Sequence, residues 1–185
     1  AYTFDALYNK LGYVTQKAVL FSGTVEDNVF FGQSAAEKTD ASLQAALSLS
    51  QAAEFVDKYP EKAAHPIAQL GRNVSGGQKQ RLPIARALAR KPEILIFDDS
   101  FSALDYKTDA VLREGLAKQL PGTTKIIVAQ RISTIRNADQ ILVLDRGEIA
   151  GLGTHDELMV SCPVYREIAM SQLSEEELKK GGVSK

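Results

Sequence analysis

The chain has 185 residues, of which 44% are hydrophobic and 24% are charged, a composition typical of a globular domain that buries its own core. The net charge of −1 provides no overall field that would favour nucleic acid or an anionic membrane surface. The single cysteine, Cys162, excludes an intrachain disulfide and favours a reducing compartment. His65 and His155 lie far apart without a cysteine partner, which argues against a zinc site. The longest apolar runs are too short to span a bilayer, and the N-terminus has no signal-peptide pattern.

The first elements predicted along the chain are a short strand and a short capped helix. Apolar residues at 11–14 predict the strand. Thr24-Val25-Glu26-Asp27 has the pattern of a capping box, in which Thr24 is the N-cap and the Asp27 side chain reaches back to it. This box predicts a helix that ends near Gly32.

A helical stretch follows. Apolar residues at helical spacing predict two helices between residues 34 and 59, and Pro60 closes the second. Residues 61–74 have the composition of a loop.

Ser75 is a favourable N-cap for a longer helix, Gly76 to Arg90. Pro83 would lie inside this helix, where it removes one backbone hydrogen bond, and we expect a kink there. Lys79, Arg86 and Arg90 would share one side of the helix, and we expect them to form a solvated basic face.

The second half of the chain alternates between strands and helices, which predicts an α/β fold with a parallel sheet. The predicted strands cover residues 94–97, 124–129, 140–145 and 148–152, and the predicted helices cover residues 107–120 and 133–136. Arg146-Gly147 predicts the turn between the last two strands. Residues 174–180 form a charged run that we expect to be frayed.

Two motifs carry the chemistry. At Ser75-Gly76-Gly77-Gln78 a helix begins, and unpaired N–H groups at a helix N-terminus attract anions. The two glycines would let a phosphate approach the backbone closely. A plain capped helix start is the structural alternative.

The second motif is Asp98-Asp99, which follows the buried strand at 94–97. Ligands of parallel sheets bind at the carboxyl ends of the strands, so both carboxylates are candidates for metal and nucleotide chemistry. Asp99 alone would also suffice as a cap for the next turn.

In this order and at this spacing, the two motifs resemble the nucleotide-binding domain of ATP-binding cassette (ABC) transporters. The runs Leu20–Val25 and Gly153–Leu158 are similar to those of ABC exporters in particular. The resemblance implies a P-loop NTPase-like parallel sheet with an inserted helical subdomain at about 25–90, a core at 91–173 and a charged tail at 174–185. ATP and Mg²⁺ are the implied cofactors.

The resemblance also implies roles for individual residues. Asp98 matches the Walker B aspartate, which orients Mg²⁺ through water. Asp99 stands where the family usually has Glu, and its carboxylate is set back by roughly 1.5 Å, one C–C bond. Gln130 stands where the family has a His that contacts the γ-phosphate, and Gln does not titrate near neutrality. Asp99 and Gln130 together indicate a degenerate catalytic site, as in heterodimeric exporters.

Further resemblances concern loops that surround the nucleotide. Gln16 resembles the Q-loop glutamine that contacts Mg²⁺. Ser102 and Asp105 belong to a run similar to the D-loop, although Asp105 would also serve as a plain N-cap. Ser75, Gly76, Gly77 and Gln78 match the signature motif, which in the family contacts ATP held by a partner domain.

No Gly-x-x-x-x-Gly-Lys-Ser/Thr loop occurs in the 185 residues. We therefore expect a partial nucleotide-binding domain that lacks the N-terminal part of the core, including the Walker A loop. From the resemblance, we expect the strand of that loop to lie next to the Asp98 strand. The open edges of the sheet would make the chain marginally stable or lead it to pair with a second copy.

The resulting hypothesis is an ATP-binding subunit of an ABC exporter, at the cytoplasmic face of the membrane, that hydrolyses little ATP by itself. Its implied partners are a second nucleotide-binding domain, in a heterodimer, and a transmembrane domain, with no role for nucleic acid. Two alternatives stay open. One is a non-catalytic module that docks on an intact cassette, and the other is a soluble ABC ATPase without a transport role. The transported substrate and the reason for Pro83 are not encoded in any motif of the chain.

Overall fold

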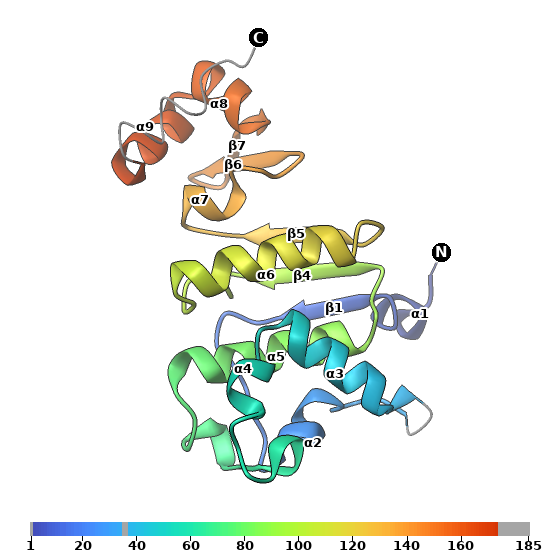
Figure 1. Ribbon diagram of the computed structural model, residues 1–185. Coiled ribbons are helices and arrows are strands. Elements are labelled where there is room, and N and C mark those ends of the chain that lie inside the picture. Colours follow the sequence, from blue (N-terminus) through green and yellow to red (C-terminus); the bar gives the residue numbers. More distant parts are fainter. Residues whose placement is uncertain (1, 35–36, 174–185) are drawn as a thin grey trace. The chain divides into compact units, whose positions relative to one another are not determined.

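The computed structural model describes residues 2–34 and 37–173, which form two compact units divided between Val128 and Ala129 (Figure 1). The predicted charged run at 174–180 lies outside the described residues. None of the described helices is long and apolar enough to cross a membrane.

A three-stranded parallel sheet forms the centre of the first unit. It contains β1 (Leu11–Val14), β4 (Ile94–Asp98) and β5 (Thr124–Val128), in the order β1-β4-β5. The register pairs Tyr13 with Ile96 and Asp98 with Val128. The parallel sheet confirms the α/β class that the alternation of strands and helices predicts.

The order of the strands corrects one expectation. We expected a further strand beside the Asp98 strand, but β1 and β5 already occupy the two edges of β4. A strand added to this sheet would have to pair with β1 or β5, because each backbone edge of a strand accepts one neighbour.

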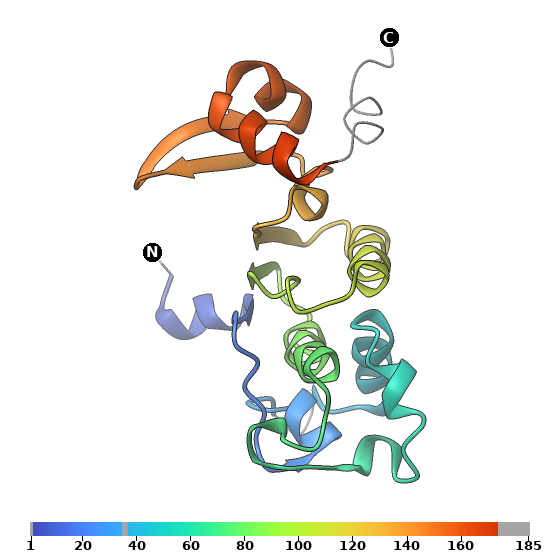
Figure 2. The same cartoon turned by 90° about the vertical axis from the view of Figure 1, so that its left-hand side faces the viewer.

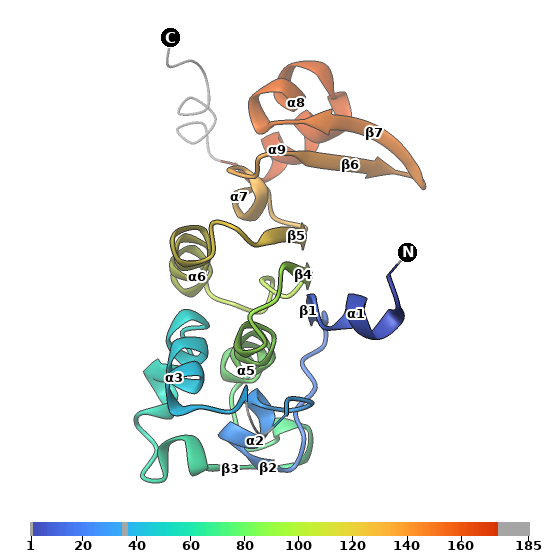
Figure 3. The ribbon, with the colours of Figure 1, turned by 90° about the vertical axis from the view of Figure 1, so that its right-hand side faces the viewer.

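Helices cover one face of this sheet. Figures 2 and 3 show α3 (Asp40–Leu49), α5 (Gly76–Ala89) and α6 (Tyr106–Gln119) on the same side of the strands. The burial pattern agrees, because Leu95 and Phe97 on that face of β4 are fully buried, whereas Ile126 and Val128 on the other face of β5 are about half exposed. The sheet of the first unit is therefore covered on one side only.

The remaining elements of the first unit follow the predicted caps closely. Thr24 and Asp27 form the expected capping box, and Ser75 and Gln78 form another at the start of α5. Pro83 lies buried inside α5, and the kink stays a prediction. The segment expected to be a loop at 61–74 also contains short ordered elements. The further elements are α1 (Phe4–Tyr8), β2 (Gly23–Thr24), α2 (Val25–Val29), α4 (Ala53–Val56), η2 (Lys62–Ala64), β3 (Pro66–Ile67) and η3 (Gln69–Gly71).

In the second unit, helices pack on an antiparallel hairpin. Strands β6 (Ile141–Asp145) and β7 (Glu148–Gly153) pair through the predicted turn, where Arg146 and Gly147 both adopt positive φ. The helices are α7 (Ile132–Ile135), α8 (His155–Ser161) and α9 (Pro163–Gln172). Inside this core, His155 Nδ1 and Tyr165 Oη lie 2.8 Å apart in a hydrogen bond.

Gly12 is required where β1 packs against the helical layer. A Cβ at this position would lie 2.8 Å from Leu95 Cδ2, 2.9 Å from Pro92 Cγ and 3.2 Å from the Ala87 carbonyl oxygen. We expect Gly12→Ala to lower the free energy of unfolding by about 1–3 kcal/mol, the usual cost of overpacking. Urea denaturation measures the change. Gly122→Ala is the control, since a Cβ there meets no atom within 4 Å. Equal effects of the two substitutions would contradict the packing argument.

Candidate functional site

The candidate site begins where β4 ends. The side chain of Asp98 is half-buried, and Asp99 is only 8% exposed. The backbone of Asp99 has φ 46°, in the left-handed region that Asp tolerates better than most residues. Its N–H donates to the Val128 carbonyl at 3.0 Å, so β5 holds this turn.

Each of these carboxylates accepts a hydrogen bond from a side chain of β1 or of the loop that follows it. Tyr13 Oη donates to Asp98 Oδ2 at 2.9 Å, and Gln16 Nε2 donates to Asp99 Oδ2 at 3.3 Å. The bond to Asp98 raises the pKa of the Tyr13 phenol above its usual range, because the carboxylate stabilises the protonated donor. The structure thus brings together Gln16 and the Asp98-Asp99 pair, as the sequence predicts. It adds Tyr13, which no motif indicates.

The segment after Asp99 turns back on itself. Ser102 Oγ donates to the Asp99 carbonyl at 2.7 Å. The Asp105 carboxylate caps α6 by accepting from the Thr108 N–H at 2.9 Å and from its hydroxyl at 2.7 Å. These bonds lower the pKa of Asp105, the backbone N–H of Thr108 having the largest effect. The structural alternative for Asp105, an N-cap, is therefore present.

The Ser75–Gln78 segment forms an open helix start. Ser75 Oγ accepts from the Gln78 N–H at 3.3 Å, and Gln78 Oε1 accepts from the Ser75 N–H at 2.9 Å. A Cβ placed on Gly76 or Gly77 would meet no atom within 4 Å. The surroundings of both glycines thus leave room for an anion to approach the first N–H groups of α5.

Gln130 lies in the second unit, in the exposed segment that follows β5. Its carbonyl accepts from Gln172 Nε2 at 2.8 Å, and Gln172 Oε1 accepts from the Ile132 N–H at 2.9 Å. Helix α9 therefore fixes the backbone at Gln130 and at the start of α7.

A model of the ABC transporter family matches residues 2–102, more than half of the chain. The chain belongs to the ABC transporter family. The confirmed fold class is that of the ABC exporter nucleotide-binding domain, the P-loop NTPase fold.

Individual proteins that are similar to this ABC transporter chain support the same family. A putative ABC transporter ATP-binding protein of Mycoplasma pneumoniae is 42% identical over 176 residues, which cover 91% of this chain and 28% of that protein. An uncharacterized ABC transporter ATP-binding protein of Mycobacterium bovis is 44% identical over 172 residues, with coverage of 92% and 29%. The structure of a bacterial Atm1-family ABC exporter with ATP bound matches with a TM-score of 0.88 at 36% identity, covering 94% of this chain and 30% of the exporter chain. The chain thus spans less than a third of the length of these proteins.

The carboxylates of this ABC transporter chain suit Mg²⁺ chemically. Asp98 Oδ1 accepts no hydrogen bond from any described residue, while Oδ2 is held by Tyr13. Mg²⁺ in nucleotide sites is commonly held by one or two carboxylates, water and substrate phosphates. Across residues 2–34 and 37–173, no group of three or more His, Cys, Asp or Glu side chains is arranged to hold a metal on its own. Asp98 would therefore hold the ion together with water, and a bound nucleotide would add phosphate ligands.

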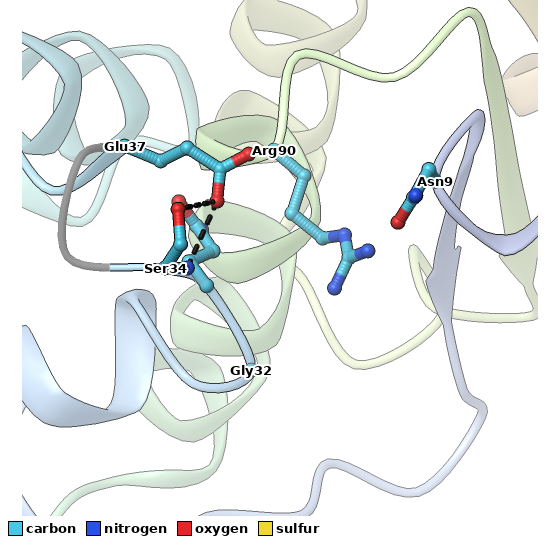
Figure 4. Close-up of a pocket in the computed structure, with 6 residues that line it drawn as sticks. Asn9, Gly32, Ser34, Glu37 and Arg90 are labelled. Atoms are coloured by element: carbon cyan, nitrogen blue, oxygen red, sulfur yellow. Dashed lines mark hydrogen bonds between the residues drawn. The ribbon is translucent and has the colours of Figure 1, made fainter. Parts of the chain in front are cut away.

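The cavity in Figure 4 is distinct from this site. It has a volume of about 440 Å³, and its lining residues are Asn9, Gly32, Gln33, Ser34, Glu37 and Arg90. Inside it, the Glu37 carboxylate accepts from the Ser34 N–H and hydroxyl, while the Arg90 guanidinium extends toward Asn9. None of the predicted site residues lines this cavity.

The expectation of a solvated basic face on α5 is wrong for Arg86. Its guanidinium donates to the Asn28 carbonyl at 2.7 Å, to Asn28 Oδ1 at 3.1 Å and to the Val19 carbonyl at 3.1 Å. It also lies over the rings of Phe21 and Phe31, at 5.3 and 5.6 Å from their centroids. Burial lowers the pKa of Arg86 through desolvation. Arg86 thus joins the segment after Gln16 to the helical layer.

We expect Arg86→Met to lower the free energy of unfolding by about 1.5–3 kcal/mol, because hydrogen bonds from a charged donor are lost while apolar packing is retained. Urea denaturation of the chain measures the effect. Arg90→Met is the matched control, since the guanidinium of Arg90 has no hydrogen bond or ion pair with another described residue, and we expect a change within about 0.5 kcal/mol. Equal losses in the two variants would contradict the structural role of Arg86.

Proposed function

We propose that this chain is the ATP-binding part of an ABC exporter and that its own catalytic pair is weakened. Membership in the ABC transporter family and the similarity to an ATP-bound exporter support ATP as the nucleotide. The observation that carries the proposal is the contrast between two places. The start of α5 is capped and open to an anion, whereas the two positions expected to serve hydrolysis hold Asp99 and Gln130.

In the proposed site, Asp98 and Gln16 hold the magnesium of Mg-ATP, with water between Asp98 and the ion. The bound ion supplies positive charge that neutralises the phosphates. Asp99 is the base that would orient the attacking water, and it is poorly suited to this task. Its short side chain is buried and engaged by Gln16, and misplacement of a catalytic group by about 1 Å forfeits about 10² in rate.

Gln130 weakens the same reaction. As a neutral amide, it can donate a hydrogen bond to a γ-phosphate oxygen but cannot become a cation near pH 7. An aspartate at position 99 and a glutamine at position 130 together support a site that binds ATP and turns it over slowly. Such a site fits a heterodimer in which the other composite site performs hydrolysis.

Ser75–Gln78 serve the ATP of the partner domain in this proposal. The partial positive charge of the α5 N-terminus and the open space at Gly76 and Gly77 favour contact with a phosphate. Ser102 and Asp105 face the same partner, because the D-loop that they resemble crosses the interface between the two nucleotide-binding domains.

An aromatic pair supports contact with the transmembrane domain at the cytoplasmic face of the membrane. Phe21 and Phe31 are stacked with centroids 4.2 Å apart and are 39% and 51% exposed. Arg86 beneath them fixes both rings. A rigid exposed aromatic pair is typical of an interaction surface, and we place a cytoplasmic helix of the transmembrane domain on it.

The chain by itself should show no saturable binding of Mg-ATP. The 185 residues contain no Gly-x-x-x-x-Gly-Lys-Ser/Thr loop, so the β- and γ-phosphates lack their usual cradle of N–H groups and lysine. A fluorescent ATP analogue titrated to millimolar concentration with Mg²⁺ tests this, with an intact cassette as the positive control. Saturable micromolar binding would contradict the proposal for the isolated chain.

Ser75→Arg tests the role of the signature segment in a complex of this chain with an intact cassette. An arginine side chain would fill the open helix start, and we expect the ATPase rate of the complex to fall by about 10²–10³, the usual cost of losing a preorganised donor. Ser75→Ala separates the smaller effect of losing the cap. Ser171→Arg, at an exposed position of helix α9, is the control and should leave the rate unchanged. An unchanged rate in Ser75→Arg would exclude the proposed role.

A further inference from the structure

Tyr13 has one polar partner in the described part of the chain, and that partner is the carboxylate proposed to hold magnesium. The phenol donates to Asp98 Oδ2 at 2.9 Å. The residue is 55% exposed, and its ring stacks on no aromatic ring among the described residues. The hydrogen bond to Asp98 therefore fixes the hydroxyl end of this half-exposed side chain.

The strand register produces this contact. Tyr13 on β1 pairs with Ile96 on β4, and Asp98 follows two residues later on the same face of the sheet. A long side chain reaches such a diagonal neighbour on an adjacent strand. The phenol thus approaches Asp98 from the β1 side, while β5 lies on the other side of β4.

We propose that Tyr13 is a positioning residue for the metal-binding carboxylate, one that fixes Asp98 Oδ2 and leaves Oδ1 to face the ion. This inference rests on the proposed function, in which Asp98 holds magnesium. A neutral donor bound to one oxygen of a carboxylate restricts its rotation and decides which lone pairs remain available. Outer partners of metal ligands act in this way, and their loss costs about 10–100-fold in metal affinity.

Gln16 makes a similar hydrogen bond to Asp99, the residue next to Asp98. Its amide donates to Asp99 Oδ2 at 3.3 Å, so the two adjacent carboxylates are each oriented from the β1 side. The loop after β1 would then set the geometry of Asp99, and Tyr13 would set that of Asp98. Asp98 Oδ1 accepts no hydrogen bond from a described residue and can face the ion. The bond from Tyr13 to Oδ2 determines that Oδ1 is the oxygen left for this role.

The test is a titration of the 185-residue chain with Mn²⁺ alone, in which electron paramagnetic resonance measures the free ion. Four proteins are compared, namely the unmodified chain and the variants Tyr13→Phe, Tyr8→Phe and Asp98→Asn. Tyr8 is the matched control, because it is exposed and its hydroxyl has no hydrogen bond to another described residue. We expect the unmodified chain to bind Mn²⁺ weakly, because water completes the shell of the ion in the absence of a nucleotide. Asp98→Asn should abolish this binding, Tyr13→Phe should weaken it by about 10–100-fold, and Tyr8→Phe should leave it unchanged.

Two results would overturn the inference, and they are distinguishable. If Asp98→Asn abolishes binding while Tyr13→Phe leaves it intact, the positioning role is wrong and the metal role of Asp98 stands. If the unmodified chain and Asp98→Asn are the same, whether both bind Mn²⁺ or neither does, the metal role fails and the role of Tyr13 fails with it.

A double-mutant cycle separates positioning from simple loss of stability. The unfolding equilibrium of Tyr13→Phe, Asp98→Ala and the double variant gives the coupling between the two side chains, because alanine removes the acceptor that an asparagine would keep. We expect the effects of the single substitutions to differ from additivity by a factor of about 3–10 in the unfolding constant, as for a hydrogen bond between contacting residues. Strict additivity would show that the two groups do not interact in solution and would overturn the inference.

Discussion

The parallel pairing of β4 on both of its edges is the constraint on which the first unit depends. Leu95 and Phe97 point into the helical layer and are fully buried, so Ile96 and Asp98 must point to the other face. A slip of one residue in the register would expose the two core side chains and bury the carboxylate. The apolar alternation that stabilises the strand therefore also determines which face carries Asp98, and the same register supplies Tyr13 from β1.

The uncovered face of the sheet combines polar chemistry with apolar surface. Asp98 lies on the same face as Tyr13, Ile126 and Val128, and each of these three neighbours is about half exposed. Covering this face with protein would remove water from the carboxylate as well as from the apolar side chains. Electrostatic interactions strengthen when water is excluded. A partner that covers this face would thus stabilise the sheet and also strengthen the electrostatic interactions of the Asp98 carboxylate.

Local interactions were predictable from the sequence, and long-range ones were not. The capping boxes at Thr24 and Ser75 involve groups only three residues apart, so the sequence pattern contains all of their atoms. The bond from Tyr13 to Asp98 spans 85 positions and depends on which strands are neighbours. The family resemblance located the two carboxylates but led us to the wrong neighbour for the β4 strand. The pattern of apolar residues predicts which segments are strands. Their order in the sheet depends on how the segments that connect them pack.

The contacts of Arg86 illustrate the same limit. Its spacing on α5 matches that of solvated basic residues, and only the fold shows Asn28, Phe21 and Phe31 around it. Arginine side chains are mostly exposed in proteins, so the sequence alone argues against the partial burial of Arg86. The carbonyl groups of Asn28 and Val19 accept hydrogen bonds from the guanidinium, and these bonds offset the cost of removing it from water.

The sequence separation of the paired strands has a consequence for the order of folding. Strands β4 and β5 are joined by the single helix α6, whereas residues 15–93 intervene between β1 and β4. Closing a short crossover costs less chain entropy than closing a long one, so β4, α6 and β5 should associate early and β1 should dock late. Tyr13 and Gln16 arrive with β1. The carboxylates would therefore gain their donors only in the last stage of folding, and chains stalled before that stage would carry Asp98 and Asp99 without the groups that orient them.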